Sequence, residues 1–141
     1  MAIPTHLRLE LVTPERAIAH EDVDQVQLPG AKGYFGVLPG HTPMLAALDV
    51  GEMWYRRGPE KTYVSVAFGV AEVLPDRVIV MCRDAERADE IDIARAEAAM
   101  QRAKAAMTKE TYSPDDLERA RVSMIKAMNR LKVAEAGRRR R

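Results

Sequence analysis

The chain has 141 residues, of which 47% are hydrophobic, and its charged side chains almost cancel to a formal net charge of +1. This length predicts one or two small domains, and the balanced charge gives no global attraction to nucleic acid. Cys82 is the single cysteine, which excludes an internal disulfide and fits a reducing compartment. No apolar run approaches the roughly 20 residues that span a bilayer, and the first residues lack the regions of a secretory signal. We therefore expect a soluble protein that meets a membrane only through a partner.

The first 88 residues alternate in period two, as half-buried strands do. Leu7, Leu9 and Leu11 alternate with polar residues, and residues 63–68 repeat the pattern. Residues 78–82 are apolar on both faces, which predicts a central strand. Turn signals rich in proline, glycine and aspartate separate these runs. Many short strands joined by turns predict an antiparallel β-sandwich or barrel.

The stretch from Val23 to Leu28 also predicts a strand, although Asp24 and Gln27 break its alternation. A β-bulge and an edge position each explain such a break. The sequence leaves both explanations open.

Residues 28–43 concentrate four glycines and three prolines around one short apolar run. They predict a turn, a strand from Tyr34 to Leu38, and a tight turn that holds His41 just beyond it. The glycine spacing is not that of a dinucleotide fingerprint, and no Gly-Lys-Ser/Thr follows, so no P-loop is expected. No nucleophile or carboxylate pairs with His41, and the three histidines show no metal-ligand spacing. We therefore expect no catalytic residue and no metal site.

Near Asp89 the hydrophobic pattern changes to a helical period. Asp89, with Asp92 three residues later, predicts an acidic cap on an alanine-rich helix that ends at about Met107. Ser113 followed by Pro114 predicts the start of a second helix. Its apolar residues are spaced as a heptad seam: Leu117, Ala120, Met124, Ala127, Leu131 and Ala134.

The expected fold is therefore α+β. An N-terminal antiparallel β-sandwich or barrel occupies residues 1–88, and a C-terminal antiparallel two-helix hairpin occupies residues 89–141. Because alanine dominates the seam, the hairpin is expected to be marginal alone, while high helix propensity keeps each helix intact. This combination suits an arm that docks, undocks and extends. A plain structural hairpin explains the same periodicity.

Three stretches resemble the epsilon subunit of bacterial F-type ATP synthases. Residues 33–43 match its Gly-x-Phe/Leu-Gly-Val/Ile-Leu-Pro-Gly-His-x-Pro run, and residues 91–96 match its Ile/Leu-Asp-x-x-Arg-Ala motif. Residues 126–135 resemble the C-terminal helix of that family. The order of a strand-rich half and a helical hairpin extends the resemblance over nearly the whole chain.

The resemblance implies a non-catalytic central-stalk (rotor) subunit of a proton-translocating ATP synthase. Its β domain would contact the gamma subunit and the c-ring, with Tyr34 and His41 at the rotor interface. Tyr34 replaces the charged or polar residue common in the family. The hairpin would lie folded on the β domain or extend into the alpha/beta catalytic hexamer and inhibit ATP hydrolysis. The basic tail, Arg138 to Arg141, would face acidic segments of the beta subunits. The implied location is peripheral, on the cytoplasmic face of the bacterial inner membrane.

The resemblance also carries over a nucleotide-binding set: Glu86, Asp92, Arg95, Ala96, Arg102, Lys126 and Arg130. Asp92 and Arg95 share one helix face, and Lys126 and Arg130 share another, so the folded helices would offer cations to phosphates. Lys126 stands where ATP-binding members tend to have arginine, and it lacks the bidentate fork. Without a cluster of Mg²⁺ ligands, regulatory ATP would be sensed and not hydrolysed, and no cofactor is required.

Two alternatives remain open. In the first, Asp92 only caps a helix and the cations form a solvated face. In the second, the chain is a stand-alone ATP-sensing or protein-binding module built on the same sandwich and hairpin.

Overall fold

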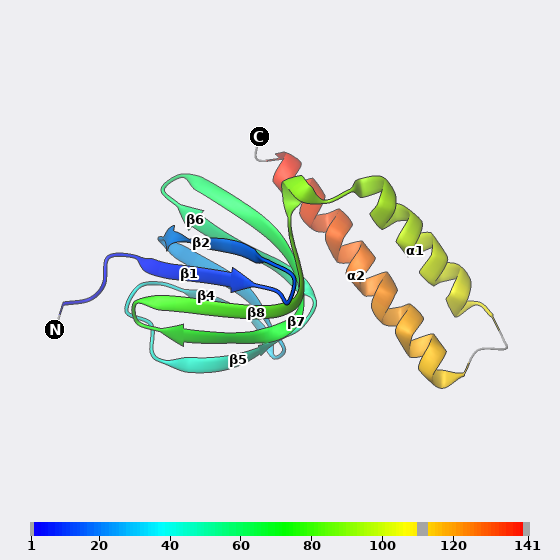
Figure 1. Ribbon diagram of the computed structural model, residues 1–141, viewed down its shortest axis with the longest axis horizontal. Coiled ribbons are helices and arrows are strands. Elements are labelled where there is room, and N and C mark those ends of the chain that lie inside the picture. The colour runs from blue at the N-terminus through cyan, green and yellow to red at the C-terminus, as the bar shows by residue number, and fades with distance from the viewer. Residues whose placement is uncertain (1, 110–112, 140–141) are drawn as a thin grey trace.

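A strand-rich half is followed by two long helices in the computed structural model, which describes residues 2–109 and 113–139 (Figure 1). The described elements are β1 (Leu7–Val12), β2 (Ala17–Val23), β3 (Gln25–Gly30), β4 (Gly33–Val37), β5 (Met44–Leu48), β6 (Gly51–Arg57), β7 (Glu60–Leu74), β8 (Arg77–Arg87), the short 3₁₀ helix η1 (Ala88–Glu90), α1 (Ile93–Met107) and α2 (Pro114–Arg139). The expected β-sandwich followed by a helical hairpin is confirmed.

The strands follow the order β2-β1-β8-β7-β5-β3-β4, and β6 pairs with both β3 and β7. Neighbouring strands pair antiparallel except β1 and β8, which run parallel. That pair departs from the expected antiparallel pattern because β1 and β8 are far apart in the chain, so no hairpin turn sets their direction. As expected, β8 is central, between β1 and β7. Its outer face is nevertheless open, since Met81 is 52% exposed.

The expected strand from Val23 to Leu28 is confirmed only from Gln25 onward, because the chain leaves β2 after Val23 and begins β3 at Gln25. Asp24 donates its backbone N–H to Arg56 O at 2.7 Å. Its carboxylate accepts from the backbone N–H of Gly58, also at 2.7 Å. The aspartate thus binds the β6–β7 turn, and β3 is neither bulged there nor at an edge, since it pairs with β4 and β6.

One long strand, β7, serves both halves of the sandwich. It pairs with β6 through residues 60–66 and with β5 through residues 69–73. Between these segments Phe68 has a φ of 54°, a left-handed conformation that is rare outside glycine. At Gly69 a Cβ would lie 2.2 Å from Met81 O, so only glycine fits there. The bend carries the first part of β7 toward the helices.

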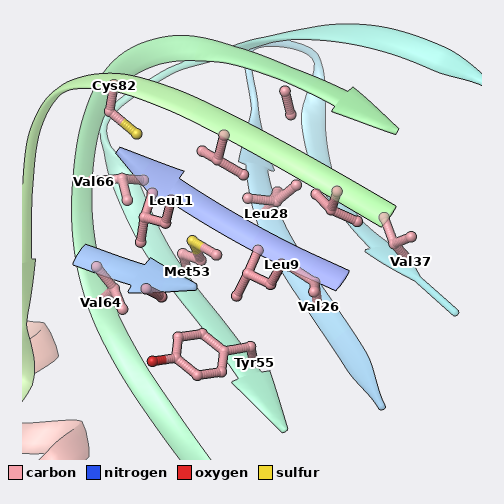
Figure 2. Close-up of a cluster of buried hydrophobic side chains, with 14 of the residues drawn as sticks. Leu9, Leu11, Val26, Leu28, Val37, Met53, Tyr55, Val64, Val66 and Cys82 are labelled. Carbon is pink, nitrogen blue, oxygen red and sulfur yellow. The ribbon is translucent and has the colours of Figure 1, made fainter. Parts of the chain in front are cut away.

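The core lies between the strands and is mainly aliphatic (Figure 2). The alternating leucines Leu7, Leu9 and Leu11 are fully buried, as their period predicted. Cys82 is 5% exposed in this core, and burial, followed by the nearby charge of Asp84, raises the pKa of its thiol to about 12. This cysteine is therefore a small apolar side chain at neutral pH.

The helices begin where local capping permits. Asp92 is the N-cap of α1, with its side chain accepting from the backbone N–H of Arg95 at 3.1 Å. The expected cap at Asp89 is wrong: residues 88–90 form η1, and Ile91 is extended and buried before α1 starts. At the second helix, Ser113 Oγ accepts from the backbone N–H of Asp116 at 3.2 Å, as the sequence predicted.

Candidate functional site

The helix α2 lies between the sandwich and α1, and it contacts β6, β7 and η1 (Figure 1). The alanines of the heptad seam at 120, 127 and 134 are buried, but Leu117 is still 38% exposed. Toward the sandwich, Val133 is fully buried in a cluster with Tyr63, Ile91 and the seam residue Ala134. Val133 lies outside the heptad spacing, so the sequence did not predict its burial.

Asn129 supplies the central polar contact between α2 and the sandwich. Its side-chain amide donates to Gly51 O and to Ser65 Oγ, each at 2.9 Å. Ser65 is only 7% exposed, so this bond satisfies a buried hydroxyl. No pattern in the sequence indicated this contact, because its acceptors lie on β6 and β7, far away in the chain.

Two ion pairs join α2 to the end of β8. Lys126 Nζ lies 2.6 Å from Asp84 Oδ2. Arg130 holds Glu86 with two contacts, Nε to Oε1 at 2.8 Å and Nη2 to Oε2 at 3.4 Å. The residues from 126 to 133 on this face therefore hold the hairpin against the sandwich by a small apolar cluster, one amide and two ion pairs.

A pocket of about 360 Å³ opens between α1, α2 and β8, and we call it the interhelical pocket. It is lined by Asp84, Glu86, Arg95, Ala99, Ser123, Lys126, Ala127 and Arg130. Four residues of the predicted nucleotide set meet here: Glu86, Arg95, Lys126 and Arg130.

The other three members of that set lie outside the pocket lining. Asp92 caps α1. Ala96 is fully buried, and Arg102 is exposed further along α1. Asp84 and Ser123 are not in the predicted set, because only the docking of α2 on β8 brings them into the pocket.

The junction of the two halves is held by Glu90, which bridges two arginines. Its carboxylate contacts Arg16 Nη2 of the β1–β2 turn at 2.5 Å and Arg87 Nη1 at 3.2 Å. The hydrogen bond from Arg16 is the main reason that the pKa of Glu90 lies below its usual value. Arg87 also donates to the carbonyl of Ile18. The residue before η1 and the last residue of η1 are therefore both bonded to the sandwich.

Of the two predicted rotor residues, only His41 lies near the end of the sandwich opposite to the helices. Pro39 and Gly40 form a turn in which His41 N donates to Leu38 O at 3.2 Å, and Gly40 has a φ of 88°. A Cβ at Gly40 would lie 2.9 Å from Ile3, on the N-terminal segment that leaves the sandwich away from the helices (Figure 1).

Tyr34 lies nearer to the docked helix. Its hydroxyl accepts from Glu52 N at 3.1 Å, next to Gly51, whose carbonyl binds Asn129 of α2. The Tyr34 side chain is 55% exposed. His41 is half-buried, and its Nδ1 donates to Thr42 O at 2.7 Å.

Residues 2–109 and 113–139 contain neither a metal-binding cluster nor a membrane-spanning helix. No group of three or more His, Cys, Asp or Glu side chains in these ranges is placed to hold a metal ion. Neither helix in this part of the chain is long and apolar enough to cross a membrane.

Both halves of the chain match one family of proteins. Residues 6–88 match the beta-sandwich domain of the ATP synthase delta/epsilon chain, and residues 89–135 match its long alpha-helix domain. The chain therefore belongs to the ATP synthase delta/epsilon chain family.

Individual relatives agree with this assignment. The ATP synthase epsilon chain 2 of Syntrophotalea carbinolica is 44% identical over 131 residues, covering 93% of this chain and 95% of the relative. The ATP synthase epsilon chain of Syntrophobacter fumaroxidans is 46% identical over 129 residues, covering 92% and 96%. The resemblance to bacterial epsilon subunits is thus confirmed.

Solved structures share the fold at lower identity. A chain in the mitochondrial ATP synthase of Euglena gracilis (OSCP/F1/c-ring, rotational state 1) superposes with a TM-score of 0.80 at 21% identity, covering 92% of this chain and 81% of that chain. A chain of the central stalk/c-ring of the Tetrahymena thermophila mitochondrial ATP synthase gives 0.58 at 11% identity, covering 94% and 99%.

Proposed function

We propose that this chain is the central-stalk epsilon subunit of a bacterial F-type ATP synthase, which couples rotation to catalysis and restrains ATP hydrolysis through its C-terminal helices. The observation that carries the proposal is how α2 rests on the sandwich. Its contacts are few and separable, centred on Asn129, Val133 and the two ion pairs. A regulatory arm needs such a surface, because it must be stable when folded and still able to leave.

The magnitudes of the individual contacts fit a releasable arm. Burying one valine contributes roughly 1.5–3 kcal/mol, and a typical hydrogen bond contributes about 0.5–1.5 kcal/mol. Partly exposed ion pairs add only about 0–1 kcal/mol each. A competing apolar groove and a complementary charged surface on partner subunits can replace contacts of this size.

We expect the sandwich and the helical hairpin to contact different partners. The turn around Gly40 is far from the helices, and it would face the gamma subunit and the c-ring through His41, whereas Tyr34 would contact the rotor from a position nearer to α2. The released hairpin would enter the alpha/beta hexamer, where its basic end meets acidic segments of the beta subunits. Membrane contact then comes only through the complex, at the cytoplasmic face of the inner membrane.

We also propose that the interhelical pocket takes ATP as a regulatory ligand. Its volume lies within the range of small-molecule sites, about 300–1,000 Å³. Arg95 comes from α1, whereas Lys126 and Arg130 come from α2, so one triphosphate would join both helices and favour the folded hairpin. Arg95→Ala and Arg130→Ala should each weaken binding, which calorimetry would measure. Because this pocket is built from one chain, it also suits the second candidate function, a stand-alone ATP-sensing module.

An experiment on the assembled complex distinguishes the central-stalk subunit from the stand-alone ATP-sensing module. Complexes are purified with the full chain and with a chain that ends at Ala88, and the gamma subunit is quantified in each. The proposal predicts stoichiometric gamma in both, and faster ATP hydrolysis with the shortened chain while proton-driven synthesis is largely kept. Failure of gamma to co-purify with the full chain would favour the stand-alone module, and equal hydrolysis rates would remove the inhibitory role.

A further inference from the structure

The cations of the interhelical pocket are already partly neutralised by the sandwich. Lys126 is paired with Asp84 and Arg130 with Glu86, both carboxylates projecting from β8. Within residues 2–109 and 113–139, Arg95 makes no ion pair. For a polyphosphate the pocket thus offers the unpaired guanidinium of Arg95. Lys126 and Arg130 can bind it only if each breaks its ion pair or shares its carboxylate with the ligand.

The two carboxylates are not equivalent. Glu86 and Arg130 have side chains that are 32% and 20% exposed, and they make two contacts with each other. Asp84 is 58% exposed and makes a single contact, to Lys126. Because a more exposed pair with one contact is weaker, the Lys126–Asp84 pair is the one that a ligand can open.

We propose that Asp84 is an internal competitor for the phosphates of ATP and thereby lowers the affinity of the interhelical pocket. The proposal rests on the nucleotide site described above. At 2.6 Å from Lys126 Nζ, the Asp84 carboxylate takes the place that a phosphate oxygen would occupy, since both groups are held by charge-assisted hydrogen bonds of this length. It also adds a negative charge to the wall of a site meant for a polyanion.

This arrangement links the ligand to the docking of the hairpin. Opening the Lys126–Asp84 pair removes one of the contacts between α2 and β8. In exchange, the triphosphate joins Lys126 to Arg95 of α1. ATP therefore tightens the hairpin itself while it loosens one of the contacts that attach the hairpin to the sandwich.

The test is an ATP titration of the full chain, followed by calorimetry, with wild type compared with Asp84→Asn. We expect the substitution to tighten ATP binding by about threefold to tenfold, because it removes both the competing ion pair and the repulsion. Sodium triphosphate should show the same direction of change, since the competition concerns phosphate oxygens. Asp22→Asn is the matched control: it removes a carboxylate that is 48% exposed and paired with Arg8, outside the pocket.

Trp54, the single tryptophan, packs against the apolar cluster formed with Val133 and reports the docked state through its fluorescence. Its emission in ligand-free Asp84→Asn should equal that of wild type, which shows that the gain does not come from a released hairpin. Asp84→Glu keeps the charge and should give no gain.

The outcomes distinguish the two proposals. Measurable and equal affinities in wild type and Asp84→Asn would overturn the role of Asp84 and leave the nucleotide site standing. An equal gain in Asp22→Asn or Asp84→Glu would do the same, because net charge or side-chain change would then be the cause. Absence of binding in every variant at millimolar ATP would overturn both the competitor and the site.

Discussion

Gly137 sets how closely α2 approaches the junction of the two halves. A Cβ at this position would lie 2.5 Å from the Cβ of Ala88, closer than two side chains can pack. Glycine inside a helix costs up to about 1 kcal/mol relative to alanine. The missing side chain therefore weakens α2 slightly but permits its contact with η1, a contact that exists only while the hairpin is docked.

Gly137→Ala should shift the hairpin toward release, because the added methyl group collides with Ala88 in the docked state. Alanine also strengthens the helix, but it does so in both states, so this effect cancels. Overpacking of this kind costs typically about 1–3 kcal/mol, so we expect docking to weaken by roughly that amount. Trp54 fluorescence during urea unfolding measures it. Gly36→Ala is the control, because a Cβ there meets nothing within 4 Å, and an unchanged docking transition in Gly137→Ala would refute the argument.

Glu90 gives the junction a defined pH dependence. Its pKa in the folded chain is lowered, mainly by the hydrogen bond from Arg16. A carboxyl with a lowered folded pKa contributes stability above its unfolded pKa and loses it as the pH falls through the folded value. The ordinary glutamate pKa is about 4.3, so the loss should occur below about pH 4 to 5.

We therefore expect the melting temperature of the wild type to fall more steeply in this acid range than that of Glu90→Gln, while at neutral pH the variant is the less stable of the two. Thermal unfolding from pH 3 to pH 7 measures both slopes. Glu118→Gln is the comparison, because the pKa of Glu118 is also lowered, by Arg121, but this pair lies exposed on α2. Parallel profiles for wild type and Glu90→Gln would show that the bridge adds no stability.

At the scale of elements, all strand pairing in the sandwich is complete before the first helix begins. The last ladder residue of β8 is Arg87, paired with Val64, and Glu90 is the next residue tied back to the sandwich. The large apolar cluster of the core contains no residue beyond Ala85. The smaller cluster around Tyr63 and Val133 is the one that depends on the helices.

A chain ending at Ala88 should therefore fold by itself and unfold cooperatively. It loses the cover of α2 over Tyr63 and Trp54, so we expect lower stability and a Trp54 emission shifted toward that of an exposed indole. Circular dichroism and fluorescence melts measure the two effects. Non-coincident or gradual transitions would mean that the domain boundary is misplaced.

The elements that the sequence predicted well are those set by local chemistry. Ser113 and Pro114 start α2 where capping rules place it, and the Pro-Gly pair at residues 39 and 40 marks its own turn. The missed features depend on residues distant in the chain. Asp24 ends β2 because it binds the β6–β7 turn, and Asn129 finds its acceptors on β6 and β7. No spacing in the sequence marks such distant partners. The cations of the interhelical pocket could therefore be predicted, but the contact surface between α2 and the sandwich could not.

At the scale of the whole molecule, the chain separates two kinds of attachment. The sandwich is held by a continuous core, whereas the hairpin is held by a limited surface on one side of α2. Its C-terminal end carries Arg138 and Arg139, and Arg139 already contacts Glu135 at 2.9 Å. Residues 140 and 141 lie outside the described residues. We expect this basic end to meet acidic surface on partner subunits when the hairpin leaves the sandwich.

Deleting residues 138–141 from the chain in an assembled complex should raise ATP hydrolysis, but less than deleting residues 89–141. Each exposed pair contributes only about 0–1 kcal/mol, so the tail assists the inhibited state and does not create it. Screening over a Debye length of about 10 Å at 0.1 M salt should make the effect of the tail deletion smaller as ionic strength rises. Replacing residues 138–141 by glutamine keeps the length of the chain and should match the deletion if charge is the cause. A rise caused by the deletion alone, or one that is equal at low and high salt, would assign the effect to chain length instead of charge.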